Sequence, residues 1–506
     1  MSIDWEIPED FIEVAKSGVF DAQWYISQNS LDSPDYLDAL EHFMEIGWKN
    51  GLDPSIHFNT NFYLDTNKDV YLANVNPLVH YLKFGWAEGR LPTFGFVAPK
   101  QASLIPNTNP LTVKIALEIS FRTSAAVQNS SRSFNLPSLH ERAEKPEISE
   151  PPIQPIRTVA FYLPQYHRIK ENDEWWGANF TDWVNVRRGE PQFRGHYQPH
   201  IPAELGYYDL TDSQVMKRQI ELAQNHGVNA FCFYVYWFGG KRLLEKPVDL
   251  FVSNPELKQD FVVCWANENW TRAWDGSESS VLISQNHSDA DDIDFIESMA
   301  PYLRDPRYMR VKGHPLLLVY RPGLLPDPVA TADRWRQWCR SNGVGEIALG
   351  YVQSFHDGDP SNFGFDYAIE FPPGTIKLPN ITDRARVDEQ HKGNVYDWTA
   401  LVKRSEEYSN PGYSLFRGAC PSWDNSVRRP FGGEVLVGST PDLFRQWLIN
   451  AGYDTVARFS DPSERVVFIN AWNEWAEGCH LEPDEKYGYQ WLHAVRDMQT
   501  IIGLSS

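Results

Sequence analysis

Two glutamates, Glu474 and Glu477, stand three residues apart just after an apolar run at 466–469. The run reads Val-Val-Phe-Ile, which suits a strand that is buried on both faces. Two indoles, Trp472 and Trp475, flank the first glutamate. Apolar walls and a like-charged neighbour both raise the pKa of a carboxyl, so one glutamate can stay protonated while the other is ionised. Carboxyl pairs of this kind cleave glycosidic bonds.

Two other interpretations of this motif are open. The glutamates can instead be solvated side chains in a loop. Another apolar run is followed by Asn267-Glu268, which resembles Asn473-Glu474, so Glu268 and Glu474 form a rival pair from two separate strands. The preferred hypothesis pairs Glu474 with Glu477 and leaves Glu268 as a substrate-binding or structural residue.

Strand-like and helical patterns alternate from residue 157 to the end of the chain. Eight apolar, strand-like runs begin near Thr158, Val228, Phe261, Pro315, Glu346, Phe365, Phe416 and Arg465. Helical patterns lie at 212–226, 288–303, 330–342, 440–452 and, as a closing helix, 484–502. This alternation predicts an α/β fold, a (β/α)8 barrel of the TIM type. A doubly wound open sheet is the alternative, but no Gly-x-Gly-x-x-Gly motif follows any of the runs.

Polar and aromatic residues gather at the ends of the first three runs and of the last one. In a closed barrel the first, second and eighth strands are neighbours, and their C-terminal ends carry the active site. The candidate substrate-binding residues at these ends are Tyr166, His167, Trp176, His196, His200, Tyr236, Trp237, Lys241, Trp265, Asn267, Glu268, Trp270, Trp472, Asn473 and Trp475. We expect the tryptophans to stack on sugar faces. We expect Asn267, Glu268 and Asn473 to bind hydroxyl groups.

Histidines and cysteines are the residues that suggest a metal site. Metal ligation is one interpretation of His167, His196 and His200, but their spacing matches no metal motif, and hydrogen-bonding loop histidines are favoured. The five cysteines, Cys232, Cys264, Cys339, Cys420 and Cys479, show no zinc spacing and no disulfide framework, which indicates a reducing compartment. We therefore expect no metal and no cofactor.

The composition argues against several classes of partner. Lys and Arg number 46 and Asp and Glu 67, which gives a formal net charge of −21. Such a chain has no general attraction to nucleic acid or anionic membranes. The 19 Trp, 23 Tyr and 28 Phe fit glycan handling and a large core equally well. No apolar run reaches the ~20 residues of a membrane span, and no signal peptide is visible, so we expect a cytoplasmic protein without a transmembrane segment.

The first part of the chain, residues 1–95, contains an internal repeat with an offset of 38 residues, as from Phe20 to Phe58. The first copy contains Phe20, Trp24, Tyr25, Asn29, His42, Gly47, Trp48, Gly51 and Pro54, and the second contains Phe58, Phe62, Tyr63, Asn67, His80, Gly85, Trp86, Gly89 and Pro92. Each copy predicts a helix, a loop and a second helix that ends at Gly-Trp-x-x-Gly. The simplest interpretation is a spacer or packing appendage, and docking to a protein or a glycan is the alternative.

Residues 96–156 are rich in Pro, Ser, Asn, Gln and Glu, which predicts an extended linker. The predicted organisation is therefore a small α-helical repeat module at 1–95, a linker at 96–156 and a catalytic barrel at 157–506.

Residues 157 to about 495 resemble the WbsX-like family, described as glycosyltransferases of bacterial polysaccharide clusters and related to family-99 glycoside hydrolases. The motifs that carry the resemblance are Tyr162-Leu-Pro-Gln-Tyr-His167, Asn172-Asp-Glu-Trp-Trp-Gly177, Gly195-His-Tyr-Gln-Pro-His200, Tyr236-Trp-Phe-Gly-Gly-Lys241, Cys264-Trp-Ala-Asn-Glu-Asn-Trp270 and Asn470-Ala-Trp-Asn-Glu-Trp-Ala-Glu-Gly478. The repeats also resemble modules found beside bacterial glycan enzymes.

The resemblance implies a mechanism as well as a barrel. The family-99 hydrolases cleave α-mannosidic bonds with retention, and their Glu-Trp-x-Glu-Gly motif matches Glu474 and Glu477. It implies that Glu474 acts as a base on the sugar 2-hydroxyl, which attacks its own anomeric carbon. Glu477 would protonate the leaving oxygen and later activate water. Specificity for mannose is not implied, because the other site residues of those hydrolases do not align with this chain.

We expect a carbohydrate-active enzyme that acts on bacterial surface or extracellular polysaccharide, as a retaining glycoside hydrolase or transglycosylase. A glycosyltransferase of O-antigen or polysaccharide biosynthesis is the first alternative, and it would need a nucleotide-linked or lipid-linked donor. A non-catalytic glycan-binding protein is the second alternative.

Overall fold

The computed structural model describes residues 9–17, 19–29, 36–55, 58–73, 75–85, 88, 90, 92, 155–193, 196–272, 277–383, 385, 393–429 and 432–505. They fall into two compact units, Met1–Glu141 and Arg142–Ser506. The predicted linker lies outside the described residues except for its last two positions, 155 and 156.

Eight parallel strands close into a barrel in the second unit. In chain order they are β1 (Arg157–Tyr162), β2 (Ala230–Phe238), β4 (Asp260–Trp265), β8 (His314–Val319), β9 (Ala348–Gln353), β10 (Tyr367–Glu370), β12 (Leu415–Ala419) and β15 (Val466–Ile469). Each strand pairs with the next, and β1 pairs with both β15 and β2, which closes the ring. The predicted (β/α)8 barrel is therefore confirmed, with all eight strands at the predicted runs, and the open sheet is excluded.

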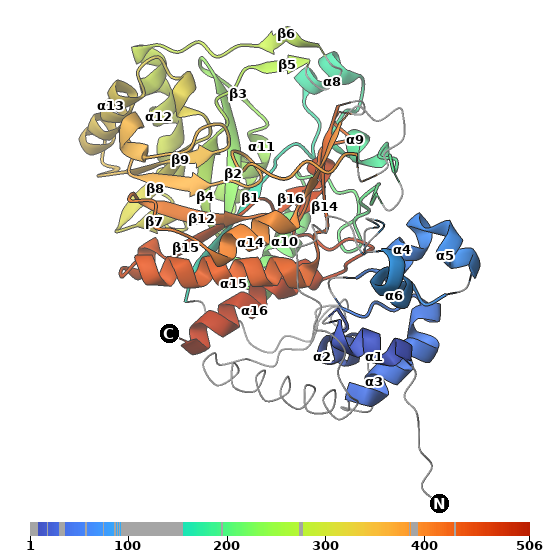
Figure 1. The fold of residues 1–506 in the computed structure, drawn as a ribbon. Helices are drawn as coiled ribbons and strands as arrows, with labels where there is room; N and C mark the ends of the chain where they lie inside the picture. The colour runs from blue at the N-terminus through green and yellow to red at the C-terminus, as the bar shows by residue number, and fades with distance from the viewer. Residues whose placement is uncertain are drawn as a thin grey trace, which may run out of the picture. The chain divides into compact units, whose positions relative to one another are not determined.

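Helices surround this barrel (Figure 1). They are α8 (Lys170–Trp176), α9 (Trp183–Arg187), α10 (Ser213–Asn225), α11 (Lys246–Ser253), α12 (Asp289–Leu303), α13 (Pro328–Ser341), α14 (Thr399–Glu406), α15 (Pro441–Arg458) and α16 (Gln490–Ser505). Helix α12 packs against α13, and α15 packs against α16. The closing helix begins at Gln490 rather than at the predicted residue 484. The intervening residues instead form a loop that packs beneath the candidate site.

The strand sequences explain why the barrel could be predicted. All nine residues of β2 and all four of β15 are buried, because helices cover the outside of the barrel and side chains fill the inside. Within the barrel, the Phe161 ring packs against the rings of Phe371 and Phe468. In the described part of the chain, no helix is long and apolar enough to cross a membrane.

The first unit is helical in its described residues. Its helices are α1 (Glu9–Lys16), α2 (Ala22–Asn29), α3 (Tyr36–His42), α4 (Thr60–Thr66), α5 (Lys68–Ala73) and α6 (Pro77–His80), and α3 and α6 continue into π-helical turns at Phe43–Gly47 and Tyr81–Gly85. The two repeats make the same contact at equivalent positions. The Tyr25 hydroxyl lies 2.8 Å from His42 Nδ1, and the Tyr63 hydroxyl lies 2.9 Å from His80 Nδ1. Two further repeat positions, Trp86 and Gly89, lie outside the described residues.

Candidate active site

The predicted glutamates lie in a short hairpin that follows β15. Strand β16 (Asn473–Glu474) pairs with β17 (Cys479–His480), and one turn of 3-10 helix leads from Glu474 to Gly478. Gly478 has a φ of +56°, and a Cβ on it would lie 3.0 Å from a neighbouring side chain, so this tight turn favours glycine. The turn leaves Glu474 buried, whereas the Glu477 side chain is 21% exposed.

One guanidinium group, that of Arg428, joins the two glutamates. Its Nη1 lies 2.7 Å from Glu477 Oε1, and its Nη2 lies 3.0 Å from Glu474 Oε2. The same Nη2 lies 2.6 Å from Asp182 Oδ2, and the Asp182 side chain is fully buried. One cation therefore faces three carboxyl groups, which repel one another when all are ionised.

Burial raises the pKa of both glutamates. Desolvation raises the pKa of Glu474 to about 8, although Arg428 lowers it, and desolvation also raises the pKa of Glu477 against the same arginine. Because the two carboxyls share one guanidinium, they lose their protons as a pair. We infer that the pair keeps one proton near neutral pH, which is the state that general acid–base catalysis needs.

Arg428 comes from a loop beside the barrel. The loop lies between β13 (Trp423–Asp424) and β14 (Glu434–Val437), which form a three-stranded sheet with β11 (Asn394–Asp397). Asp424 anchors this loop, because its carboxylate accepts a hydrogen bond from Gln198 at 2.5 Å and lies 2.6 Å from His196 Nε2. The predicted site residue His196 thus supports the loop of Arg428.

A third buried glutamate, Glu482, holds the hairpin in place. Four side chains donate hydrogen bonds to its carboxylate at 2.7–2.9 Å: Trp472, Trp475, Tyr208 and Gln219. Desolvation raises the pKa of Glu482 to about 7. Both indoles that flank Glu474 in the sequence therefore bind a structural carboxylate.

The hairpin is also tied to the end of β1. The Tyr166 hydroxyl donates to the Asn473 carbonyl at 2.9 Å and accepts from the Trp475 amide at 3.1 Å. The Asn473 side chain accepts from the Leu163 amide at 2.7 Å and donates to its carbonyl at 3.1 Å. Tyr166 and Asn473 therefore lie next to Glu474. Their side chains bind the backbone of the hairpin and of the segment after β1, so they position Glu474.

The predicted sugar-stacking tryptophans divide into two groups. Trp237, Trp265, Trp472 and Trp475 are at most 5% exposed. The Trp265 ring stacks on Phe295 at 4.2 Å, and Trp237 donates to Asp291, so protein atoms cover these rings and we assign the four to packing. Trp176 and Trp270 are partly exposed and remain candidates for sugar contact. Trp270 packs edge-on against Tyr236, with ring centroids 5.1 Å apart.

Tyr236 lies close enough to Glu474 to be affected by its charge. Its hydroxyl accepts a hydrogen bond from Gln165 at 3.3 Å. Burial, and to a smaller extent the charge of Glu474, raises the pKa of Tyr236. The structure therefore brings Tyr236 together with Glu474.

The polar residues predicted from β4 bind a different arginine. The Asn267 side chain bonds the Arg321 amide and carbonyl at 2.9 Å, and Glu268 forms an ion pair with the Arg321 guanidinium at 2.9 Å. Glu268 is thus linked to Arg321, whereas Glu474 and Glu477 share Arg428. This arrangement favours Glu477 over Glu268 as the partner of Glu474.

Three other predicted residues take separate positions. Lys241 is half-exposed and pairs with Glu171 at 2.6 Å. His167 is buried, and its Nδ1 lies 2.8 Å from the Pro164 carbonyl. His200 lies 2.8 Å from His480, beneath the hairpin.

Sequence reasoning missed Arg428 and Glu482 and gave no role to Asp182. Arg428 precedes Arg429 in a segment with no regular pattern, shortly after the seventh strand. That pair of arginines after a barrel strand was the available signal. Glu482 lies between the Glu474–Glu477 motif and the helix predicted at 484–502, and no sequence pattern marked it as part of the site.

A cavity of about 530 Å³ lies next to these supports. Tyr166, Trp183 and Tyr208 form part of its wall, together with the arginines Arg168, Arg187 and Arg188. The Arg187 guanidinium lies over the Tyr207 ring, 4.0 Å from its centre. Asp209 also lines the cavity, which is therefore aromatic and, with three arginines against one carboxylate, mainly cationic.

Comparisons with known proteins give the family. Residues 158–495 match the protein family described as "Glycosyltransferase WbsX". Proteins named WxcX from two strains of Xanthomonas campestris pv. campestris are each 50% identical, over 351 and 354 residues, which is 69% and 70% of this chain and 50% and 51% of theirs. The chain thus spans about half the length of these curated relatives.

Solved structures with a similar chain include glycoside hydrolases. A GH99 endo-alpha-mannosidase from Bacteroides thetaiotaomicron is 13% identical, with a TM-score of 0.45 over 69% of this chain and 99% of its own. A glycoside hydrolase-like protein is 16% identical, with a TM-score of 0.44 over 71% of this chain and 98% of its own. The family description covers the whole barrel, from β1 to within α16, and with it the hairpin of Glu474 and Glu477, so this chain belongs to the WbsX glycosyltransferase family.

Proposed function

We propose that the barrel breaks a glycosidic bond in an oligosaccharide or polysaccharide, with retention of configuration, through Glu474 and Glu477. The observation that carries the proposal is the carboxyl pair on Arg428, one member buried and the other 21% exposed, just after the C-terminal end of β15. This is the end of a (β/α)8 barrel where active sites lie. Family and fold point to a carbohydrate-active enzyme, and a carboxyl pair that shares a proton fits that chemistry.

The proposed reaction has two steps. In the first, Glu474 takes the proton of the sugar 2-hydroxyl, whose oxygen bonds to the anomeric carbon while Glu477 protonates the departing glycosidic oxygen. In the second, Glu477 takes a proton from water, and the water oxygen bonds to the anomeric carbon. The bond from that carbon to the 2-oxygen breaks, and Glu474 returns its proton to the 2-oxygen. Atoms and charges balance over the two steps, and both glutamates return to their starting protonation states.

This cycle requires the shared proton to lie on Glu477 when the substrate binds. Glu474 has the less exposed side chain of the two, 7% against 21%, which favours the opposite placement in the free site. We propose that the substrate shifts the proton by bringing its 2-hydroxyl to Glu474. The two roles therefore need an experiment that separates them.

The test compares Glu474→Gln and Glu477→Gln with the wild type on aryl glycosides and on bacterial surface polysaccharides. A good leaving group needs no acid, so Glu477→Gln should keep the first step on an aryl glycoside, and azide should restore turnover by replacing water. Glu474→Gln should fail on both substrates. Glu485→Gln, an exposed glutamate of the same segment, is the matched control. If azide restores turnover in Glu474→Gln and not in Glu477→Gln, the two glutamates have the opposite roles. Unchanged turnover in both variants would refute their assignment as the catalytic pair.

A glycosyltransferase is the second candidate, and the cationic cavity favours it together with the family description. Its three arginines and its aromatic rings suit the diphosphate of a nucleotide-linked or lipid-linked donor. Water labelled with ¹⁸O separates the candidates, because hydrolysis places the label in the new reducing end and transfer does not. Release of a nucleoside diphosphate together with an unlabelled product would favour transfer.

A further inference from the structure

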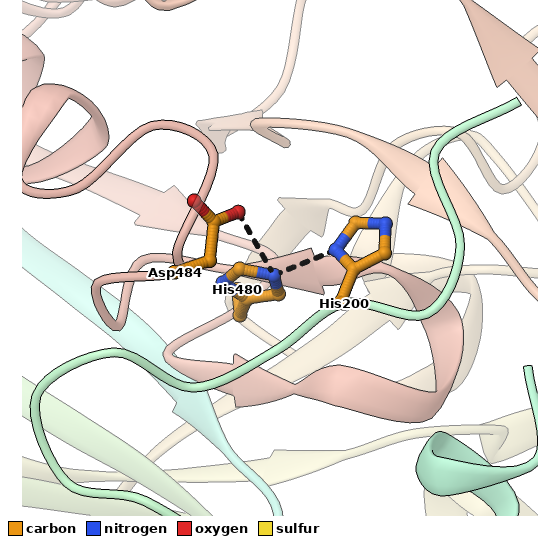
Figure 2. Close-up of side chains that lie close together, drawn as sticks. All are labelled: His200, His480 and Asp484. Atoms are coloured by element: carbon orange, nitrogen blue, oxygen red, sulfur yellow. Dashed lines mark hydrogen bonds and ion pairs between the residues drawn. The ribbon is translucent and has the colours of Figure 1, made fainter. Parts of the chain in front are cut away.

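We propose that His200, His480 and Asp484 bind a divalent transition-metal ion, with Zn²⁺ as the best match, beneath the glutamate hairpin. Figure 2 shows His200 and Asp484 on either side of His480, with both contacts converging on one of its nitrogens. His480 Nε2 lies 2.8 Å from His200 Nδ1 and 3.8 Å from Asp484 Oδ2, and the three atoms all lie within 4.8 Å of one another.

These distances suit coordination after a small shift. With metal bonds of about 2.0–2.1 Å, tetrahedral ligand atoms stand about 3.3 Å apart. That value lies between the two separations observed around His480 Nε2. Two imidazoles and one carboxylate are ligands that Zn²⁺ accepts, and water would supply a further ligand.

The orientation of His480 is that of a metal ligand. Its Nδ1 lies 2.9 Å from the Glu482 carbonyl, so Nδ1 carries the proton and the lone pair of Nε2 points at the centre of the cluster. Metal-binding histidines are commonly fixed by such a bond to a backbone carbonyl. Without an ion, His200 Nδ1 donates to this lone pair. On binding, the His200 proton would move to its Nε2, and both nitrogens would be free to coordinate.

Asp484 supplies the second independent observation. Its Oδ1 accepts a hydrogen bond from the Tyr487 amide at 2.5 Å, whereas its Oδ2, which faces His480, is buried without a hydrogen bond of ordinary geometry, although the Tyr197 hydroxyl also interacts with this carboxylate. The residue is only 1% exposed. An unpaired carboxylate oxygen in such a place is costly, and a cation at the centre of the cluster would satisfy it.

The ion would brace the catalytic hairpin from below. The His480 ring stacks on Trp475, with centroids 3.7 Å apart and planes 16° from parallel, and Trp475 stands between Glu474 and Glu477 in the sequence. The expectation of no metal rested on the local spacing of His167, His196 and His200 and of the five cysteines. The second histidine ligand comes from 280 residues further along the chain, where local spacing gives no signal.

The test is metal binding by the full chain, after chelator treatment, with Co²⁺ followed by its visible absorption and Zn²⁺ as competitor. We expect one equivalent to bind the wild type. Asp484→Asn and His200→Gln should each weaken binding by about 100-fold. Removal of a residue that only supports a metal ligand already costs about 10–100-fold in affinity, and removal of a ligand should cost at least as much. His226→Gln is the control, because His226 and His493 are also close, with ring centroids 5.4 Å apart.

A variant that gains a new absorption band distinguishes loss of the metal site from loss of the fold. Asp484→Cys would place a thiolate at the same corner, and its Co²⁺ complex should show a sulfur-to-cobalt charge-transfer band. Co²⁺ binding by the wild type that is no tighter than in the His200→Gln Asp484→Asn double variant would overturn the proposal. So would a folded Asp484→Cys variant without that band. Neither readout depends on catalytic activity, so failure here leaves the proposed reaction untouched.

Discussion

Arg428 Nη1 lies 2.7 Å from Glu477 Oε1, and the same guanidinium also holds Glu474 and Asp182. The arginine comes from a loop beside the barrel, whereas both glutamates follow the last barrel strand. Burial of the Arg428 guanidinium costs free energy, and its contacts with three carboxyl groups offset that cost. It also couples the protonation of the two glutamates to the position of one side chain.

Replacement of Arg428 by methionine should destabilise the protein by about 3–5 kcal/mol, the usual effect of removing one partner from a buried ion pair. The loss should be larger at about pH 8 than at about pH 5, because the raised pKa values mean that the pair binds more protons at the lower pH and depends less on the cation. Urea unfolding at both pH values measures the difference. Arg429→Met, at the exposed neighbouring position, is the control. Equal losses at the two pH values would contradict the shared role of Arg428.

The Glu474→Gln variant should gain stability relative to the wild type as the pH rises. Burial raises the pKa of Glu474 to about 8 from its ordinary value of 4.5. The contribution of such a group is fully present below pH 4.5 and is lost as the pH rises toward 8, by up to about 1.4 kcal/mol for each pH unit. Glutamine has no proton to lose, so the unfolding free energy of the variant should lack this fall. Parallel urea curves at about pH 5 and about pH 8 would show it, and a constant difference would rule it out.

Glu482 offers a prediction about the support of the hairpin. Its two oxygens accept four hydrogen bonds, whereas the amide of Glu482→Gln has one oxygen and would turn its NH₂ toward at least one donor. Each buried donor left unpaired costs about 1–3 kcal/mol. We therefore expect a loss of this size or more in unfolding free energy, together with a change in the near-UV signal of Trp472 and Trp475. Glu485→Gln should do neither, and a Glu482→Gln variant as stable as that control would disprove the role.

The barrel could be predicted from the sequence because each strand is covered on both sides. The runs in β2 and β15 are continuously apolar for that reason, and the glutamates stand out because they follow such a run. The partners of the glutamates could not be predicted in the same way. Arg428 lies in an irregular loop, and its link to Glu474 spans 46 residues, so no local periodicity marks it.

The tryptophans show a second limit of sequence reasoning. A ring at the end of a strand can face a ligand or the core, and residue type does not distinguish the two. Trp472 and Trp475 face the core, because both indole N–H groups donate hydrogen bonds to the buried Glu482 carboxylate. Of the six tryptophans predicted to stack on sugars, only Trp176 and Trp270 keep part of their surface open to solvent.

The helical repeats provide the last prediction, because each contains a glycine pressed against a tyrosine. A Cβ on Gly85 would lie 2.0 Å from the Tyr63 hydroxyl oxygen but 3.2 Å from the ring carbon that bears it. Gly85→Ala should therefore unfold or strongly destabilise the module. Tyr63→Phe should cost only the hydroxyl's hydrogen bond to His80, about 1 kcal/mol.

The double variant should reveal the contact directly. Removal of the hydroxyl makes room for the new methyl group, so Gly85→Ala with Tyr63→Phe should be more stable than Gly85→Ala alone, with an interaction energy of about 1–3 kcal/mol. Gly47→Ala with Tyr25→Phe should repeat the result, because the corresponding distance in the first repeat is also 2.0 Å. Thermal or urea unfolding of the full chain, followed at a helical signal, measures both cycles. Additive effects in either repeat would mean that the tyrosine hydroxyl does not set the glycine requirement, because a clash between two atoms must vanish when one of them is removed.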